Sequence, residues 1–182
     1  TMFKTSSDTD FTHLSAKNQY DEFAHFEARM RPFMDERVYP ELGWTIKRTP
    51  ERGNIHRDLI ANDGKENFDV EEKFRTSIWG DCAIELIQDA TYFGRLKEEQ
   101  VGWFYTSTSR YLIYAFARGM DAVKPSSAYI VSFNRLRAKF NQLIESGFNQ
   151  KIIKSSKGVG LSFSVGFDWE DLLIAEVARK II

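Results

Sequence analysis

Three residues in the first half of the chain, Asp58, Glu71 and Lys73, have types and spacing that suit metal-assisted hydrolysis. Asp58 opens a short apolar run, the turn sequence Asn-Asp-Gly follows at 62–64, and Glu71 and Lys73 lie in the next run. Side chains alternate along a strand, so Glu71 and Lys73 share one face while Glu72 points the other way. A hairpin would bring Asp58 beside that pair.

Converging carboxylates of this kind favour a hard cation. Two carboxylates are costly to ionise side by side unless a cation lies between them, and Mg²⁺ takes oxygen ligands. A neighbouring lysine would hold or activate the attacking water and offset phosphate charge. Such a site polarises a phosphodiester, supplies hydroxide near neutral pH and stabilises the developing negative charge. The residues therefore suggest a Mg²⁺ site, in which Mn²⁺ could substitute.

An amphipathic helix precedes these residues. From 16 to about 39, apolar residues recur at steps of three and four, which predicts a helix with one buried face. Those apolar residues are Phe23, Phe26, Met30, Phe33 and Met34. Pro32 is expected to kink or break the helix.

After Pro40 the chain changes to short runs of β-forming residues, with helices nearer its end. We predict strands at 44–48, 58–61, 68–74, 83–87, 111–116, 128–133 and 161–165, and helices at 134–146 and 168–179. The first four strands are expected to form an antiparallel meander, and Asp168 is a plausible N-cap for the last helix. The fold class is therefore α/β (α+β), a central mixed β-sheet flanked by helices. Residues 1–15 are expected to form a flexible arm, and 16–182 a single domain.

Asp58 followed by Val70-Glu71-Glu72-Lys73-Phe74 resembles the PD-(D/E)XK nuclease superfamily. The core of this restriction-endonuclease-like fold is a helix followed by a meander that carries an Asp and then a Glu-x-Lys. The segments 83–87, 102–106 and 110–114 are similar to those of phage-type members, so the resemblance covers roughly residues 20–117. One departure is Arg57, which stands before Asp58 where the family pattern has proline.

The resemblance implies a Mg²⁺-dependent endo- or exonuclease, acting on DNA, with Asp58 and Glu71 as metal ligands and Lys73 as the catalytic lysine. Many members also place a glutamate of the first helix at the site. Glu27 and Glu22 both qualify, and we prefer Glu27. A homodimer would supply the two active sites that many such nucleases need to cut both strands. The alternative is a catalytically silent nucleic-acid-binding or assembly module on the same fold.

Several residues near these motifs allow two interpretations. Asp69 shares the face of Glu71 and is either an extra ligand or a solvated carboxylate, and we favour the solvated carboxylate. Glu85 lies in an apolar run and could line the site, pair with an arginine or be exposed. Four aromatic residues could stack on bases, but core packing explains them better. They are Trp103, Tyr105, Tyr111 and Tyr114.

Charge is unevenly distributed along a chain whose net charge is only -1. Residues 58–99 hold eleven acidic and five basic side chains, whereas 118–157 hold two acidic and eight basic ones. The acidic segment could hold cations and the basic one could face phosphates. The basic residues at 135–139 and at Lys151, Lys154 and Lys157 could bind a nucleic-acid backbone, but a solvated helix face is the favoured interpretation for any single one.

Other classes of protein are less consistent with the sequence. The single cysteine, Cys82, and three dispersed histidines argue against a Cys/His zinc site. No run approaches the roughly 18 apolar residues of a membrane span, so we expect a cytoplasmic protein without a membrane partner. A small-molecule enzyme on an unrelated α+β fold would require a deep apolar pocket away from the carboxylates.

Overall fold

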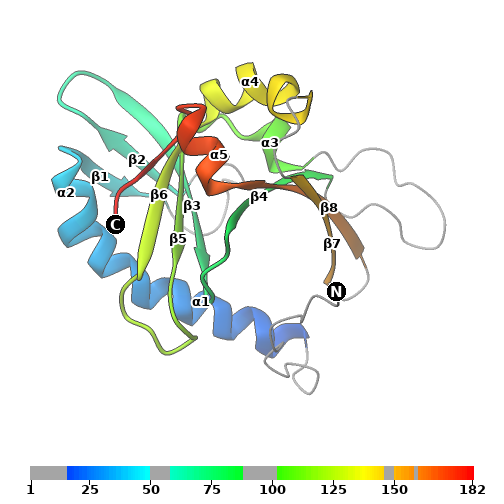
Figure 1. The fold of residues 1–182 in the computed structure, drawn as a ribbon. Helices are drawn as coiled ribbons and strands as arrows, with labels where there is room; N and C mark the ends of the chain where they lie inside the picture. The colour runs from blue at the N-terminus through cyan, green and yellow to red at the C-terminus, as the bar shows by residue number, and fades with distance from the viewer. Residues whose placement is uncertain (1–15, 50–57, 88–101, 146–149, 158–159) are drawn as a thin grey trace.

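The computed structural model describes residues 16–49, 58–87, 102–145, 150–157 and 160–182 (Figure 1). Its helical segments are α1 (Ala16–Phe33), the π-helix η1 (Met34–Val38), α2 (Tyr39–Glu41), α3 (Trp103–Thr106), α4 (Phe133–Glu145) and α5 (Trp169–Ile174). Its strands are β1 (Thr45–Arg48), β2 (Leu59–Asn62), β3 (Asn67–Arg75), β4 (Asp81–Ile87), β5 (Tyr111–Phe116), β6 (Ser127–Ser132), β7 (Gln150–Lys157), β8 (Gly160–Asp168) and β9 (Ala178–Lys180).

These strands form two sheets. The larger sheet is mixed and has six strands in the order β1-β2-β3-β5-β6-β9, and the smaller is antiparallel with the order β4-β8-β7. Helix α1 packs on one face of the larger sheet, while α4, α5 and the smaller sheet share a core with its other face (Figure 1). The predicted mixed sheet flanked by helices is confirmed, and the second sheet is an addition to it.

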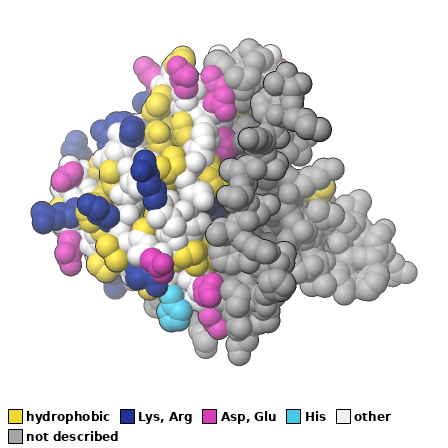
Figure 2. Space-filling view, turned by 60° about the horizontal axis from the view of Figure 1, so that its bottom comes forward, with side chains coloured by type: hydrophobic (Ala, Val, Ile, Leu, Met, Phe, Trp, Pro, Cys, Tyr) yellow, Lys and Arg dark blue, Asp and Glu magenta, His cyan; other side chains and the backbone are white. Residues whose placement is uncertain are grey.

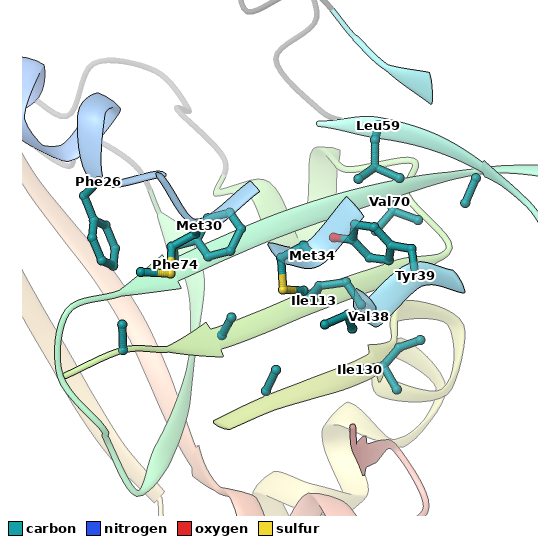
Figure 3. Packing of buried hydrophobic residues seen from close by; sticks show 14 of the residues in the cluster. Phe26, Met30, Met34, Val38, Tyr39, Leu59, Val70, Phe74, Ile113 and Ile130 are labelled. Carbon is teal, nitrogen blue, oxygen red and sulfur yellow. The ribbon is translucent and has the colours of Figure 1, made fainter. Parts of the chain in front are cut away.

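The first helix follows the predicted apolar spacing. Phe26, Met30 and Met34 are fully buried, and they pack against β3 residues including Val70 and Phe74 (Figure 3). Pro32 lies inside α1 without ending it. A proline removes one helical hydrogen bond, and the chain continues through the wider turn of η1 directly after it. The predicted break is therefore wrong, and the helical run continues to the end of α2.

The predicted turn between β2 and β3 is confirmed. Gly64 has a φ of 88°, a conformation that favours glycine, and its N–H donates to Asn62 Oδ1 at 2.7 Å. Asp63 Oδ1 accepts the N–H groups of Lys65 at 3.0 Å and Glu66 at 3.1 Å. These bonds satisfy the loop backbone locally and set the register in which Leu59 faces Val70.

The meander contains β1, β2 and β3, and the prediction that the strand at 83–87 continues it is wrong. After β3 the chain leaves the larger sheet as β4, which pairs with β8. It returns through α3 to β5, which runs parallel to β3. Parallel neighbours need such a crossover, and nothing in the local apolar pattern of β4 identifies its distant partner.

The predicted helix at 168–179 is too long. Helix α5 ends at Ile174, Glu176 takes a left-handed φ of 56°, and β9 then pairs with β6. Asp168 occupies the expected N-cap position but makes no side-chain cap hydrogen bond. Strand β7 was not predicted, because this edge strand of the smaller sheet is rich in lysine and serine and lacks apolar alternation.

In the part of the chain that the structure describes, no helix is both long enough and apolar enough to cross a membrane.

Gly102 allows α3 to lie directly on β4. Its N–H donates to Leu86 O at 2.8 Å, and a Cβ at this position would lie 2.3 Å from Glu85 O. Since the obstructing atoms belong to backbone, we expect Gly102→Ala to lower the free energy of unfolding by about 1–3 kcal/mol, measured by urea denaturation. Gly80→Ala is the matched control, because a Cβ there meets nothing within 4 Å. Equal midpoints for the two variants would contradict this packing.

Candidate active site

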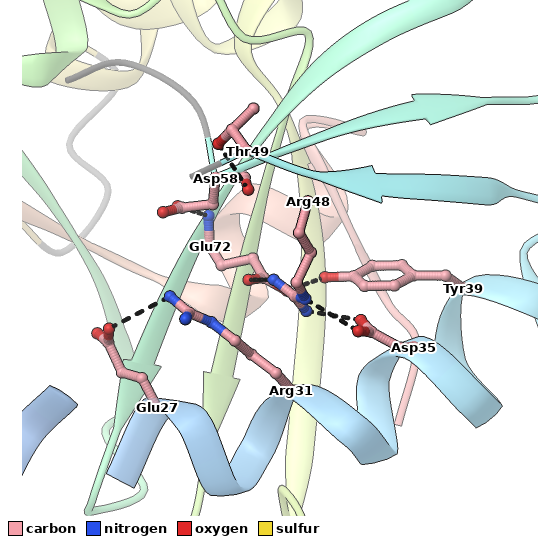
Figure 4. A network of polar contacts seen from close by, with 8 residues as sticks. All are labelled: Glu27, Arg31, Asp35, Tyr39, Arg48, Thr49, Asp58 and Glu72. Carbon is pink, nitrogen blue, oxygen red and sulfur yellow. Dashed lines mark hydrogen bonds and ion pairs between the residues drawn. The ribbon is translucent and has the colours of Figure 1, made fainter. Parts of the chain in front are cut away.

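Asp58 is held by main-chain hydrogen bonds at the start of β2. Its N–H donates to Val70 O at 2.9 Å, and its carbonyl oxygen accepts the Thr49 N–H at 3.1 Å and the Thr49 hydroxyl at 3.0 Å. Its carboxylate accepts the N–H of Glu72 at 2.7 Å (Figure 4). The Asp58 carboxylate therefore lies against the peptide that joins Glu71 to Glu72.

Glu71 and Lys73 form an ion pair on the face of β3 opposite α1. Lys73 Nζ lies 2.5 Å from Glu71 Oε1, and the side chain of Glu71 is only 6% exposed. The second oxygen, Glu71 Oε2, is buried and has no hydrogen-bond partner among the described residues. A buried carboxylate oxygen without a donor is costly, and a cation would stabilise it. The structure thus places Glu71 and Lys73 on one face of β3, as strand alternation predicts, whereas the Asp58 carboxylate is located by its hydrogen bond from the N–H of Glu72.

Glu27 of α1 belongs to the same electrostatic environment. Burial raises the pKa of Glu27, Asp58 and Glu72 raise it further, and Arg31 and Lys73 act in the opposite direction. Figure 4 shows the Glu27 side chain reaching from α1, with Arg31 Nη2 3.8 Å from Glu27 Oε2. The other candidate on this helix, Glu22, is exposed.

A buried polar network surrounds Glu72, on the α1 side of β3. Tyr39 Oη donates to Glu72, and Arg48 Nη1 donates to Glu72 Oε2 at 2.7 Å. Arg48 also donates to both oxygens of Asp35, at 2.6 and 2.9 Å (Figure 4). The acidic neighbours and their hydrogen bonds raise the pKa of Arg48 despite its burial. Sequence reasoning missed this network, although strand alternation placed Glu72 on the core face, where a carboxylate needs partners.

The aromatic residues near the motif serve mainly as packing. Tyr114 is buried, Tyr111 stacks on Trp44 with ring centroids 5.5 Å apart, and Trp103 lies beneath Lys73 Nζ, 5.6 Å from its centroid. The prediction of core packing is confirmed for these three. It is wrong for Tyr105, which is 57% exposed.

Asp69 and Glu85 are both half-buried. Asp69 faces Ile60 across β2 and β3, on the face that carries Glu71. Ile84 is buried in the core shared by the two sheets. Because neighbouring side chains alternate along a strand, the side chain of Glu85 points to the other face of the smaller sheet. The role of Asp69 as solvated carboxylate or ligand stays a prediction.

The basic residues of α4 donate to backbone carbonyls instead of forming a purely solvated face. Arg137 donates to Phe104 O at 2.9 and 3.1 Å, and Lys139 Nζ donates to Ala175 O at 2.6 Å. The expected solvated face is therefore wrong for these two half-buried side chains, whereas Arg135 is 60% exposed. The side chains of the lysines on β7, the residue Arg57 and the arm at 1–15 lie outside the described residues.

Positive charge is not concentrated on the described surface in Figure 2. There, Lys and Arg side chains stand among acidic and apolar ones. An open groove of about 590 Å³ lies between Trp44, Tyr111, Arg135, Glu176 and Arg179. Because charged side chains line it, this groove is not the deep apolar pocket expected of a small-molecule enzyme.

The donor chemistry of the site suits a hard cation, but the ligand set is small. Across the described residues, no group of three or more Cys, His, Asp or Glu side chains is placed to hold a metal ion. Asp58 and Glu71 supply two carboxylates, one of them with the partnerless oxygen. Cys82 is fully buried, and burial raises the pKa of its thiol, so it contributes no thiolate ligand.

Comparisons with protein families, with characterised proteins and with solved structures find no match for this chain. Its function must therefore be argued from the chemistry of the site.

The Glu72 network predicts a large stability loss on substitution of Arg48. Arg48→Met leaves the Glu72 carboxylate, 1% exposed in its side chain, without its cation. We expect the free energy of unfolding to fall by about 3–5 kcal/mol, measured by urea denaturation at neutral pH. The double variant Arg48→Met with Glu72→Met removes both charges and should recover part of the loss. If Arg48→Met were as stable as the wild type, the Arg48–Glu72 ion pair would contribute nothing to the free energy of unfolding.

Glu27 predicts a pH-dependent stability difference. Because the folded pKa of Glu27 lies above its ordinary 4.5, the folded state holds this proton more tightly than the unfolded chain. The resulting stabilisation is present below the unfolded pKa and is lost as pH rises through the folded pKa. We expect Glu27→Gln to gain stability relative to the wild type over the pH interval that begins near 4.5 and rises through the folded pKa of Glu27, measured by thermal unfolding. A relative loss over that interval would contradict the direction of the shift.

Proposed function

We propose that this chain is a metal-dependent nuclease of the restriction-endonuclease-like fold, which hydrolyses phosphodiester bonds of DNA at Asp58, Glu71 and Lys73. The observation that carries the proposal is the buried, partnerless Oε2 of Glu71, whose other oxygen pairs with Lys73. The Asp58 carboxylate lies close along the chain of contacts, because it accepts the N–H of the next residue, Glu72. The element order supports the fold assignment, because a helix precedes a meander in which Asp58 comes directly before β2 and the Glu-x-Lys lies on β3.

Two carboxylates are enough for the proposed cation. Mg²⁺ usually keeps several waters and is bound through one or two carboxylates together with substrate phosphate oxygens. A group of three protein ligands is therefore not required. When bound, Mg²⁺ would polarise the phosphodiester and lower the pKa of a coordinated water.

Lys73 has two roles that depend on the state of Glu71. Without a cation, its ammonium neutralises Glu71 at 2.5 Å. Once Glu71 serves as a metal ligand, the ammonium is available to orient the attacking water and to offset phosphate charge. Trp103 beneath Lys73 Nζ restricts the directions that the side chain can take. Glu27 of α1, whose ionised form is disfavoured by burial, is the candidate to accept a proton.

A catalytically silent nucleic-acid-binding module is the second candidate. The observation in its favour is the Glu71–Lys73 ion pair, which can neutralise the site without a metal. The lack of a three-ligand group among the described residues agrees with it. Such a module would bind DNA without cutting it, whereas the nuclease would cut it, with a homodimer supplying a second site for the other strand.

Cleavage of duplex and single-stranded DNA in Mg²⁺ or Mn²⁺ tests the nuclease. We expect Asp58→Asn, Glu71→Gln and Lys73→Met each to lower the rate by about 10²–10³-fold, because each removes a charge that stabilises the transition state. The assay follows release of labelled fragments, and circular dichroism checks folding.

Glu66→Gln is the matched control for these variants. Glu66 is an acid in the turn of the same hairpin, but its side chain is 56% exposed and pairs with Arg110. Its substitution should leave the cleavage rate unchanged. Absence of cleavage by the folded wild type on every substrate would reject the nuclease and favour the silent module.

A further inference from the structure

Arg137 is a cation that the described structure orients but does not neutralise. Its Nε and Nη2 donate to Phe104 O, and Nη2 also donates to Ser107 O at 2.5 Å. No carboxylate of the described residues lies within ion-pair distance, and Nη1 makes no hydrogen bond with them. Two carbonyls therefore fix the plane of the guanidinium and leave one edge available for another acceptor.

The Arg137 guanidinium and the Lys73 ammonium each lie over an aromatic ring, and these two rings contact each other. Arg137 Cζ lies 4.8 Å from the centroid of Phe133, and Phe133 packs edge-on against Trp103 with centroids 5.7 Å apart. Lys73 Nζ lies over the same Trp103 ring at 5.6 Å. The two cations thus lie against two rings that contact each other, on the face of β3 that carries Glu71.

The electrostatics agree with this placement. Burial lowers the pKa of Arg137, and the charge that acts in the opposite direction is Glu71. An arginine remains charged at neutral pH even after such a shift. Holding a half-buried cation on neutral carbonyls is costly, and a phosphate anion would offset that cost through charge-assisted hydrogen bonds.

We propose that Arg137 binds a phosphate of the nucleic-acid strand whose backbone lies at Glu71 and Lys73. The inference rests on the proposed function, since it assigns part of the substrate to the same site. Arg137 is then a substrate-positioning residue, which contributes to the affinity for the nucleic acid as well as to the rate of cleavage.

The other basic residues of α4 provide a contrast. Arg135 donates to Glu176 O at 2.9 Å and lies 3.9 Å from the Glu176 carboxylate, so its charge has a partner. Arg135 is also 60% exposed. It is therefore the matched control, an arginine on the same helix that the proposal assigns no phosphate.

The test measures binding of a labelled DNA duplex by fluorescence anisotropy, in Ca²⁺ to limit cleavage, across a series of salt concentrations. Loss of one phosphate contact lowers the slope of log K against log salt by about 0.9. We expect that change for Arg137→Gln, a wild-type slope for Arg135→Gln, and a wild-type slope with weaker binding for Arg137→Lys, which keeps the charge.

A folded Arg137→Gln variant with the wild-type slope would overturn the proposal, and so would a wild type that does not bind DNA. If Arg137→Gln does not fold, the wild type itself provides the test. Inorganic phosphate should shift the ¹⁵N side-chain signal of Arg137 and not that of Arg135, and the absence of a selective shift would overturn the proposal.

The two proposals can fail separately. A reduced slope for Arg137→Gln in a protein that cuts no DNA would support the phosphate contact and reject the nuclease. Cleavage by the wild type together with an unchanged slope would support the nuclease and reject the role of Arg137.

Discussion

The neutralisation of two adjacent carboxylates on β3 is the constraint on which the rest of this structure depends. Glu71 and Glu72 are both buried, and alternation sends them to opposite faces of a strand with neighbours on both sides. A buried carboxylate costs several kcal/mol unless it is paired and hydrogen-bonded. Each face therefore had to supply its own cation, Arg48 on the helix side and Lys73 on the other. The two solutions differ, because Glu72 is fully bonded whereas one oxygen of Glu71 has no donor.

This difference separates a structural role from a chemical one within two consecutive residues. The Glu72 carboxylate, held by Tyr39 and Arg48, fixes β3 against α2 and β1. The backbone N–H of the same residue orients the Asp58 carboxylate. The position of Asp58 is thus set by regular strand backbone and by a buried network, which hold a side chain more accurately than a mobile loop can. The proposed catalytic geometry would inherit its rigidity from residues that take no part in the chemistry.

Sequence reasoning succeeded where the information is local. Apolar spacing predicts the first helix, Asn62-Asp63-Gly64 predicts the turn, and alternation predicts the faces of Glu71 and Lys73. It failed where a partner lies far along the chain. Nothing near β4 indicates that it pairs with β8, and nothing near Glu72 indicates that Arg48 would reach it. The missed strands β7 and β9 are edge strands of their sheets, and their sequences lack the apolar alternation that would produce a period of two.

On the proposed function, the charge of the Glu71 face would change when a divalent cation binds. Without a metal, the charges of Glu71 and Lys73 balance each other on this face, which also carries the guanidinium of Arg137. A divalent cation at Asp58 and Glu71 would offset both carboxylates and leave Lys73 and Arg137 as uncompensated cations against two contacting rings, Trp103 and Phe133. The site would then attract a phosphodiester much more strongly than before, because phosphate binding depends on net positive charge within reach. Metal and substrate would therefore bind cooperatively, through electrostatics alone and without any movement of the backbone.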